Sequence, residues 1–419
     1  MKEKIKLGYI GLGRRGRGVL RNFLQMPDVE IAYVCDLNPA LFDVTAESCE
    51  KKGVSLPDTA VRTTDYRDIL NDPTVDGVLI MTDWASHAML AKESVLAGKY
   101  TGVEVGCSYT LQECFDLIDA YEQTKAPLMM LENCCYDRRE MLALNMAKQG
   151  LFGEIVHCDG GYLHHLNHED LFYHPLNGID HYRIKEYATR NCEQYPTHEL
   201  GPICKVLNIN RGNRLLWLNS IASKSRGLQQ YAADHVPEGT PFKDTDFKQG
   251  DIIKTLITCA NGETISLTLD TTLPRPYYSR GFTVRGTKGM LTEERKVVFL
   301  EGMEEGVKFN EAEFFEKYDH PLYKEYSQME HRGGHGGMDW LLCRAFVESV
   351  KAGVDTPIDA YDTVTWMCIA ALSEESIQKK GAPVEIPDFT RGQWKNRTPA
   401  PKMKYSLAEI VDDPTVKIY

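Results

Sequence analysis

The first third of the chain alternates short apolar runs with stretches of helical periodicity. The apolar runs predict buried strands, and the segments between them, beginning with 16–25, predict helices. A strand–helix–strand order produces right-handed crossovers and a parallel sheet. The pattern therefore predicts an α/β domain over residues 1–133, with strands at 5–10, 30–35, 77–81, 100–103 and 127–131.

The pattern changes after residue 133. A helix is predicted from Arg138 to Gln149, and further helices at 338–352 and 361–380. Between them, strand-like runs follow one another as in hairpins, with Asn261-Gly262 as one turn. These runs lie at 155–163, 214–223, 252–259, 264–271 and 281–285. We expect an α+β domain with an open, mainly antiparallel sheet over 134–390. The Pro-rich segment from Pro383 to Pro401 is expected to wrap the surface and lead into a tail over 391–419.

Charge and composition narrow the range of partners. The formal net charge of −12 argues against nucleic acid and anionic membranes, which both require basic surface. No apolar run reaches the ~18 residues of a membrane span, and the first residues leave no room for a secretory leader. We expect a cytoplasmic protein, or an exported one whose leader has been removed. The 12 cysteines contain no CxxC pair and fit reduced thiols that fill the core.

A glycine-rich turn follows the first predicted strand. Gly11-Leu12-Gly13-Arg14-Arg15-Gly16 has GxGxxG spacing, opens a helix and precedes an acid, Asp36, at the end of the next strand. In this context the glycines admit a dinucleotide pyrophosphate to the backbone, and the helix N-terminus stabilises its charge. Asp36 is expected to bind the adenosine ribose, which favours NAD over NADP, while Arg14 and Arg15 soften that preference. The motif predicts a Rossmann domain, and the alternative is a purely structural glycine turn.

The strand at 77–81 ends in a polar segment that is expected to face the ligand. Strand C-termini in such sheets point toward the bound cofactor. Thr82, Trp84 and His87 follow this strand and are therefore predicted to lie near the cofactor. The alternative is a core tryptophan and a histidine that caps a helix.

The strand at 100–103 is followed by Glu104-Val105-Gly106. Here the chain resembles the Gfo/Idh/MocA oxidoreductases, which carry Glu-Lys-Pro at this point. Their lysine helps to polarise the hydroxyl that is oxidised, and this chain has Val105 instead. A simple dehydrogenase therefore lacks its expected acid–base group.

Longer blocks narrow the resemblance. They are Glu132-Asn133-Cys134-Cys135-Tyr136, Gly150-Leu151-Phe152-Gly153-Glu154, Gly160-Gly161-Tyr162-Leu163-His164, Tyr195-Pro196-Thr197-His198, Leu200-Gly201-Pro202, Asn208-Ile209-Asn210-Arg211-Gly212, Pro274-Arg275-Pro276-Tyr277, Gly286-Thr287-Lys288-Gly289 and His335-Gly336-Gly337-Met338-Asp339. From about residue 5 to 390 the chain resembles glycoside hydrolase family 109, the NAD-dependent α-N-acetylgalactosaminidases. Valine after glutamate at 104–105 is also that family's pattern. The chain departs from the family at Glu199, where glycine is usual, and over 165–182.

The resemblance implies functional residues at matching positions. The implied NAD contacts are Arg14, Arg15, Asp36, Trp84, His87, Glu104, Val105 and Asn133. The implied sugar contacts are Tyr162, Arg183, Tyr195, Pro196, Thr197, His198 and Tyr277, with Tyr278 adjacent to the last. We add His164 to this group because it shares a strand face with Tyr162.

The resemblance also implies a redox-neutral glycosidase reaction. In the family, NAD⁺ oxidises the C3 hydroxyl of the sugar, a base removes the acidified C2 proton, and the C1 substituent is eliminated. Water then adds, and the ketone is reduced back. Ordinary glycosidases use two carboxylates instead.

The implied reaction needs groups that transfer protons near neutral pH. His198 is our choice of base, because a histidine titrates in that range and this one lies at a predicted helix start, which favours enolate charge. Tyr195 is expected to exchange a proton at the C3 hydroxyl, and Tyr162 to act beside it. Arg183 is expected to bind a ring hydroxyl or the acetamido group. For each of these residues the alternative is a structural role.

Two other functions stay open. One is a net NAD-dependent dehydrogenase of sugars or cyclitols, and the other is a non-catalytic protein that binds or senses NAD. His164, His165, His168 and Glu169 could form a metal cluster only if the segment were helical, so no metal is predicted. The segment 333–337 lacks the residues that complete a phosphate loop. The open sheet predicts a homo-oligomer.

Overall fold

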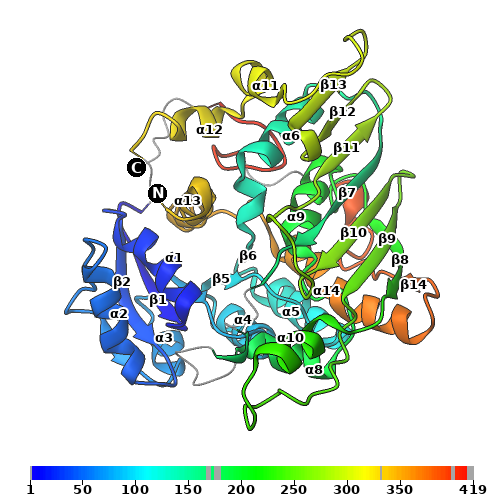
Figure 1. The fold of residues 1–419 in the computed structure, drawn as a ribbon. Coiled ribbons are helices and arrows are strands. Elements are labelled where there is room, and N and C mark those ends of the chain that lie inside the picture. The colour runs from blue at the N-terminus through cyan, green and yellow to red at the C-terminus, as the bar shows by residue number, and fades with distance from the viewer. Residues whose placement is uncertain (1, 167–170, 174–180, 331–332, 398–401, 413–419) are drawn as a thin grey trace.

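The structure, a computed structural model, describes residues 2–166, 171–173, 181–330, 333–397 and 402–412. Two sheets stand side by side, and helix α13 (Met338–Ala352) lies between them (Figure 1). No helix in these ranges is long and apolar enough to cross a membrane.

The first sheet is parallel, with strand order β3-β2-β1-β4-β5-β6. This confirms the predicted Rossmann architecture. The strand order also reverses between β1 and β4, which in such sheets opens a ligand-binding crevice. The pattern missed only the short strand β3. The strands are β1 (Ile5–Ile10), β2 (Val29–Cys35), β3 (Val61–Thr63), β4 (Gly77–Ile80), β5 (Tyr100–Glu104) and β6 (Leu128–Leu131). The helices are α1 (Arg14–Leu24), α2 (Ala40–Glu50), α3 (Arg67–Asn71), α4 (Trp84–Leu96) and α5 (Leu111–Thr124).

Helix α13 packs on this first sheet although it lies far along the chain. Its Phe346 is fully buried and sits over two strand glycines. A Cβ at Gly77 or Gly102 would lie 3.4 or 3.3 Å from the Phe346 ring, so small residues in β4 and β5 let the helix approach. The second half of the chain thus contributes directly to the core of the first sheet.

The second sheet is mixed and mainly antiparallel, in the order β13-β12-β11-β7-β10-β9-β8-β14. Only β7 and β10 pair in parallel, and the predicted open sheet is confirmed. Its strands are β7 (Ile155–Leu163), β8 (Leu215–Ala222), β9 (Ile252–Cys259), β10 (Thr264–Asp270), β11 (Thr283–Gly286), β12 (Gly289–Thr292), β13 (Val297–Leu300) and β14 (Val384–Glu385). The helices of this half are η1 (Asn133–Tyr136), α6 (Arg138–Lys148), α8 (Tyr182–Thr189), α9 (Thr197–Val206), α10 (Gly227–His235), α11 (Glu311–Tyr318), α12 (Pro321–Tyr326), η3 (His335–Gly337) and α14 (Ala360–Gln378).

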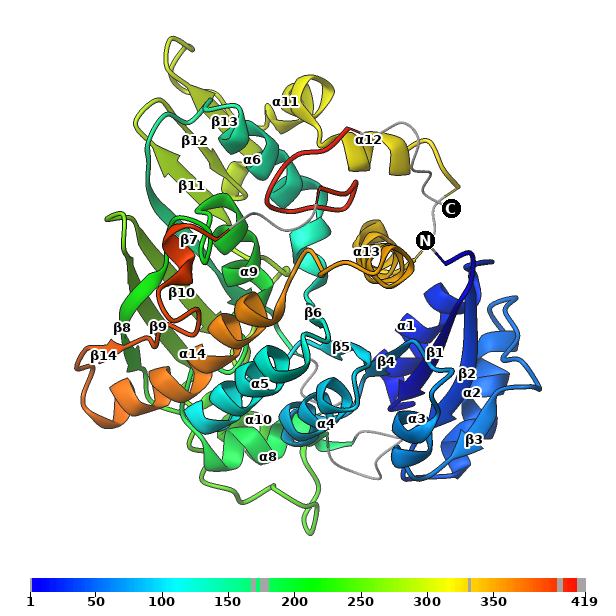
Figure 2. The ribbon, with the colours of Figure 1, turned by 180° about the vertical axis from the view of Figure 1, so that it is seen from behind.

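The two faces of the second sheet differ. Helices α9 and α14 cover one face (Figure 2), where alternate residues such as Ile253 and Ile257 are buried. On the other face, Trp217, Ile221 and Leu256 are 40%, 59% and 50% exposed. This alternation is that of an antiparallel sheet with one open face.

The C-terminal segment contributes to the second sheet and to the core. Val384 and Glu385 pair with Leu218 and Trp217 and add β14 to the sheet edge. Farther on, Tyr405 and Leu407 are buried, and the Tyr136 hydroxyl donates to the Tyr405 carbonyl at 3.1 Å. The prediction of a surface tail is corrected here, because apolar side chains at these positions find partners in the core that local sequence does not reveal.

Candidate active site

A cleft of about 1620 Å³ runs along the C-terminal edge of the first sheet and reaches β7 and α9 of the second half. It brings together most of the predicted site residues. Those that line it are Gly11, Gly13, Arg14, Arg15, Gly16, Asp36, Thr82, Trp84, Glu104, Val105, Asn133, Tyr162, His164, Arg183, Tyr195 and His198. One end of the cleft is lined by the glycine-rich turn, and the other end is lined by aromatic side chains.

The glycine-rich turn is shaped for close approach of a ligand. Gly11 has φ +98°, and a Cβ there would lie 2.6 Å from the Met81 carbonyl. A Cβ at Gly16 would lie 2.2 Å from the Gly11 oxygen. A Cβ at Gly13, the N-cap of α1, would meet nothing within 4 Å, so this position opens into the cleft. The backbone of the first helical turn and the helix dipole at this point fit a pyrophosphate.

Asp36 stands at the end of β2, beside the turn. Its carboxylate accepts hydrogen bonds from the Leu12 N–H at 2.8 Å and the Asn38 N–H at 2.9 Å. These bonds hold the acid at the rim of the cleft, next to the glycines. The position matches the one from which a ribose is bound in dinucleotide domains.

Trp84 and His87 open α4 but face different surroundings. Trp84 lines the cleft, and its ring centroid lies 5.8 Å from that of Tyr195. His87 is buried and its Nε2 lies 3.0 Å from the Thr82 carbonyl. Burial lowers the pKa of His87 to about 4, so its ring is neutral. The structure thus places His87 as a buried support of the 82–84 turn, which is neither the predicted cofactor contact nor the helix cap considered as its alternative.

A network of ion pairs and hydrogen bonds lines the cleft around Arg15. The Arg15 guanidinium donates to both carboxylate oxygens of Asp339, at 2.7 and 3.0 Å, and its Nε donates to Glu104 at 3.0 Å. Asn133 Nδ2 also donates to Asp339, at 2.7 Å. Burial opposes charge on Asp339, but His335 and Arg15 lower its pKa well below the ordinary range. The site prediction omitted Asp339, and its only signal was its membership of the 335–339 block.

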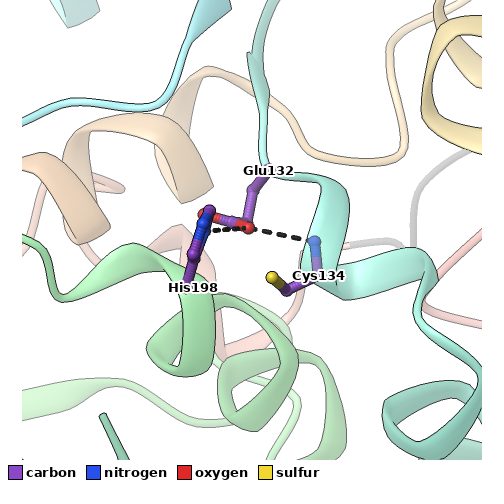
Figure 3. A group of neighbouring side chains, drawn as sticks. All are labelled: Glu132, Cys134 and His198. Atoms are coloured by element: carbon purple, nitrogen blue, oxygen red, sulfur yellow. Dashed lines mark hydrogen bonds and ion pairs between the residues drawn. The ribbon is translucent and has the colours of Figure 1, made fainter. Parts of the chain in front are cut away.

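The imidazole of His198 is held by a carboxylate that the site prediction also omitted. His198 Nδ1 lies 2.9 and 3.1 Å from the two oxygens of Glu132 (Figure 3). Glu132 follows β6, is fully buried, and also accepts the Cys134 N–H at 3.0 Å. Burial opposes its charge, but His198 and these hydrogen bonds lower its pKa.

Nδ1 is engaged by Glu132, so Nε2 is the His198 nitrogen available to the cleft, which the residue lines. The contacts within the Glu132–Cys134–His198 group are hydrogen bonds, and we treat it as a hydrogen-bonded cluster (Figure 3). Of the histidine cluster considered from the sequence, His164 and His165 line the cleft, and positions 168 and 169 lie outside the described residues.

Aromatic rings surround a guanidinium at the other end of the cleft. Arg183 Cζ lies 4.7 Å from the Tyr195 ring centroid, 5.3 Å from Trp84 and 5.8 Å from Tyr162. Burial and the neighbouring Tyr162 raise the pKa of Tyr195 well above its ordinary value, so its hydroxyl stays protonated. Such a cage offers ring faces to a sugar and donors to its hydroxyls.

His164 stacks in parallel on Tyr162, with 5.3 Å between ring centroids. Burial, together with the charge of Arg183, lowers the pKa of His164 to about 4. This imidazole is therefore neutral and a weak base. His198, in contrast to His164, is paired with a carboxylate, that of Glu132.

Comparison with known proteins assigns the family. A family model described as "Glycosyl hydrolase 109, C-terminal domain" matches residues 136–396, and one described as "Oxidoreductase family, NAD-binding Rossmann fold" matches 5–132. A glycosyl hydrolase family 109 protein of Stenotrophomonas maltophilia (strain K279a) is 39% identical over 416 residues, covering 95% of this chain and 91% of the relative. The chain belongs to glycosyl hydrolase family 109. A second relative in this family, an alpha-N-acetylgalactosaminidase of Tannerella forsythia, is 37% identical over 94% of this chain and 88% of its own.

Solved structures support the fold at lower identity. A levoglucosan dehydrogenase in complex with NADH and levoglucosan aligns over 92% of this family 109 chain and all of its own, with TM-score 0.66 and 19% identity. An NAD-binding oxidoreductase from Klebsiella pneumoniae aligns with TM-score 0.70 and 16% identity over 92% of this chain and all of its own. The family 109 chain is thus an enzyme with a Gfo/Idh/MocA-type domain, and its cofactor is NAD.

Four residues predicted by the family resemblance do not line the cleft: the buried His87, and Pro196, Thr197 and Tyr277. Pro196 and Thr197 are buried where α9 begins and serve to present His198. Tyr277 is 65% exposed and packs on Arg275. Its neighbour Tyr278 is 43% exposed and does not line the cleft either, but its ring lies 6.1 Å from that of Tyr162, which does.

Proposed function

We propose that this chain is a redox-neutral glycosidase that retains NAD through the catalytic cycle. The observation that carries the proposal is the pair formed by His198 and Glu132, because it supplies an oriented base at the aromatic end of the cleft. Val105 occupies the position at which the related dehydrogenases use lysine, so the base comes from α9. We propose an N-acetylhexosaminide as substrate, since the Tannerella relative is named alpha-N-acetylgalactosaminidase.

His198 is proposed as the base that removes the sugar C2 proton. With Nδ1 directed to Glu132, the imidazole presents Nε2 as the acceptor. Glu132 would stabilise the imidazolium that forms, in the way a buried carboxylate does beside a catalytic histidine. The N-terminus of α9 supports the enolate charge that develops next to it.

Tyr195 and Arg183 are proposed to handle the sugar hydroxyls. The protonated phenol of Tyr195 donates to the C3 oxygen, while Arg183 binds a neighbouring hydroxyl or the acetamido oxygen. Tyr162 and Trp84 offer ring faces for the C–H groups of the pyranose. Bound NAD supplies the hydride acceptor and donor at C3.

The cofactor would lie along the predicted residues of the first half. The turn 11–16 is proposed to hold the pyrophosphate, Asp36 the ribose, and Thr82, Glu104, Val105 and Asn133 the nicotinamide side. The ion pair of Arg15 and Asp339 would hold the cofactor-contacting residues in place. A retained cofactor suits a cycle in which no net oxidation occurs.

A panel of α- and β-aryl glycosides, followed for aglycone release and NADH absorbance together, tests the proposal. We expect aglycone release without accumulation of NADH. A net sugar or cyclitol dehydrogenase would instead form NADH in proportion to oxidised sugar, and a non-catalytic NAD-binding protein would give neither signal. Absence of aglycone release across the panel would refute the glycosidase.

We also propose that two copies associate through the open face of the second sheet. Trp217, Ile221 and Leu256 form a row of exposed apolar side chains on adjacent strands β8 and β9. Such a row on a monomer is a common mark of an interface. Sedimentation velocity should give a dimer or larger for the native chain and a smaller species for Trp217→Ser with Leu256→Ser. A monomeric native chain would refute this.

A further inference from the structure

Behind the aromatic end of the cleft, a single guanidinium meets several acids. Arg280 lies between β10 and β11, and its side chain is 4% exposed. Its Nε donates to Glu140 at 2.9 Å and its Nη2 to Asp137 at 2.8 Å. The same Nε lies 3.2 Å from a carboxylate oxygen of Glu199. Three carboxylates therefore share one buried cation.

The basic side chains around this group are too few to neutralise its carboxylates. The titratable and charged groups that face Glu199 and Glu140 from the packed elements are Cys134, Asp137, Arg139, Cys158, Arg280, Glu293 and Glu311. Arg139 is engaged by Glu311 at 2.5 Å and by Glu293 at 3.5 Å. Ionised acids would outnumber guanidinium groups in a space from which water is excluded. Burying an uncompensated charge is costly, so one acid takes up a proton instead.

The hydrogen bonds identify which acid is least supported as an anion. Burial raises the pKa of Glu140 as well, but one of its oxygens accepts two hydrogen bonds from Arg280, which support its anion. Neither oxygen of Glu199 accepts a hydrogen bond from a described residue, and this side chain is fully buried. Glu199 is packed in a space left by Gly160, where a Cβ would lie 2.1 Å from Glu199 Cγ. Burial, with the charge of Glu140, raises the pKa of Glu199 well above its ordinary value.

Arg280 connects this group to the sugar end of the cleft. Its Nη1 lies 3.5 Å from the Cys134 sulfur, and its Cζ lies 5.9 Å from the Tyr278 ring centroid. Tyr278 packs edge-on against Tyr162 and His164, with ring centroids 6.1 and 5.2 Å apart. Movement of Arg280 would therefore change the wall against which the sugar is proposed to lie.

We infer that Glu199 is a neutral acid beside the ionised Glu140, and that the two are positioning residues that hold Arg280 and, through it, Tyr278. At neutral pH the Glu199 carboxyl thus keeps a proton that an exposed glutamate would have lost. Its loss at alkaline pH would add a second buried negative charge beside Glu140 and loosen the support of Tyr278. The activity part of the test rests on the proposed glycosidase function, whereas the proton itself can be observed without turnover.

Infrared spectroscopy of the NAD-loaded enzyme with isotope-labelled glutamate observes that proton directly. At neutral pH we expect the C=O band of a protonated carboxyl group in the wild type. Glu193 is a second buried glutamate, and burial raises its pKa to about 8, so the variants are compared in the Glu193→Gln background. In that background the band should be absent when Glu199→Gln is added and unchanged when Glu385→Gln is added, a control at an exposed glutamate of β14 (83% exposed side chain). No band in Glu193→Gln alone, or a band that survives the addition of Glu199→Gln, would overturn the inference. This outcome is independent of any glycosidase activity.

The pH profile of kcat/KM for an aryl glycoside provides the second arm. Glu199→Gln cannot ionise, so its alkaline fall should move up by roughly one pH unit or more, as expected when one coupled carboxyl is removed. Glu385→Gln should follow the wild type. A profile of Glu199→Gln that superimposes on the wild type would overturn the positioning role, because a purely structural role would not move this limb.

Discussion

The Nδ1 atom of His198 lies 2.9 Å from a carboxylate oxygen of Glu132, although 66 positions separate the two residues in the chain. The carboxylate fixes the tautomer of the imidazole and directs Nε2 to the cleft. Glu132→Gln keeps the shape but removes the charge that stabilises an imidazolium. We expect kcat to fall about 100-fold, and His198→Ala to lower it by about 10³, in the range of general-base effects.

Steady-state kinetics on the best aryl glycoside of the panel measure both variants. NAD binding, followed by fluorescence titration, serves as the control and should stay within about twofold, since neither change touches the glycine-rich turn. An unchanged kcat in Glu132→Gln would show that His198 needs no carboxylate partner.

Two glycines of the NAD turn are expected to differ in role, one in cofactor binding and the other in folding stability. A Cβ at Gly13 meets nothing within 4 Å, whereas one at Gly16 lies 2.2 Å from the Gly11 oxygen. Gly13→Ala should fold normally and weaken NAD about tenfold or more, because the methyl group enters the pyrophosphate space. Gly16→Ala should lower the free energy of unfolding by about 1–3 kcal/mol through overpacking. Thermal melts and NAD titration of both variants, in parallel, check the contrast; equal behaviour would contradict it.

Asp339 is expected to support the cofactor end through Arg15. Asp339→Asn removes the charge of the bidentate partner and leaves Arg15 with the carboxylate of Glu104 and a contact to His335. The Kd for NAD should rise about tenfold, corresponding to one charged hydrogen bond of about 1.5 kcal/mol. Calorimetric titration measures the change, and an unaltered Kd would mean that Arg15 keeps its position without Asp339.

Tyr278 and Tyr277 form a matched pair for the sugar wall. Tyr278 packs on Tyr162 and His164, whereas Tyr277 is mainly exposed. We expect Tyr278→Ala to raise KM about three- to tenfold, because an aromatic contact of about 0.5–1.5 kcal/mol is lost. Tyr277→Ala should remain within about twofold. The reverse order of effects would restore Tyr277 as the sugar contact.

The stability of the fold should depend on the Glu199 proton. The folded pKa of this carboxyl is raised, so between the ordinary glutamate pKa and the raised one the folded state binds more protons than the unfolded state. The free energy of unfolding therefore falls as pH rises through that window. Urea unfolding at several pH values should show this slope in the wild type and a smaller one in Glu199→Gln. Equal slopes would mean that Glu199 does not titrate in the window.

The elements of the first half were predictable because their signals are local. A strand, a glycine turn and a helix follow one another within the first 24 residues, and each has its own periodicity or spacing. Strands β12, β13 and β14 have only two to four residues each, so their own patterns carry little signal and pairing with neighbours decides them. The predicted open, mainly antiparallel sheet was therefore confirmed, but its outer strands were not predicted.

The sequence motifs point to many residues that the structure brings into one cleft, but not to the distant partners that hold them. Trp84, Tyr162, Tyr195 and His198 meet in one cleft as expected. His87 is buried in α4 and bonds the Thr82 carbonyl, and Tyr278, not Tyr277, packs on Tyr162, because the helix face and the path of the loop between β10 and β11 decide which of two nearby side chains packs inward.

The sequence by itself determined the dinucleotide turn, the positions of most of the parallel strands and the family, since these depend on residues close together or on long matching blocks. Only the tertiary structure decided that Glu132 holds His198, that Asp339 pairs with Arg15 across 324 positions, and that Glu199 shares Arg280 with Glu140. The physical reason is that hydrogen bonds and buried charges act over a few ångströms in space. The distance along the chain between two such groups carries no trace of their contact until the core packs and brings them together.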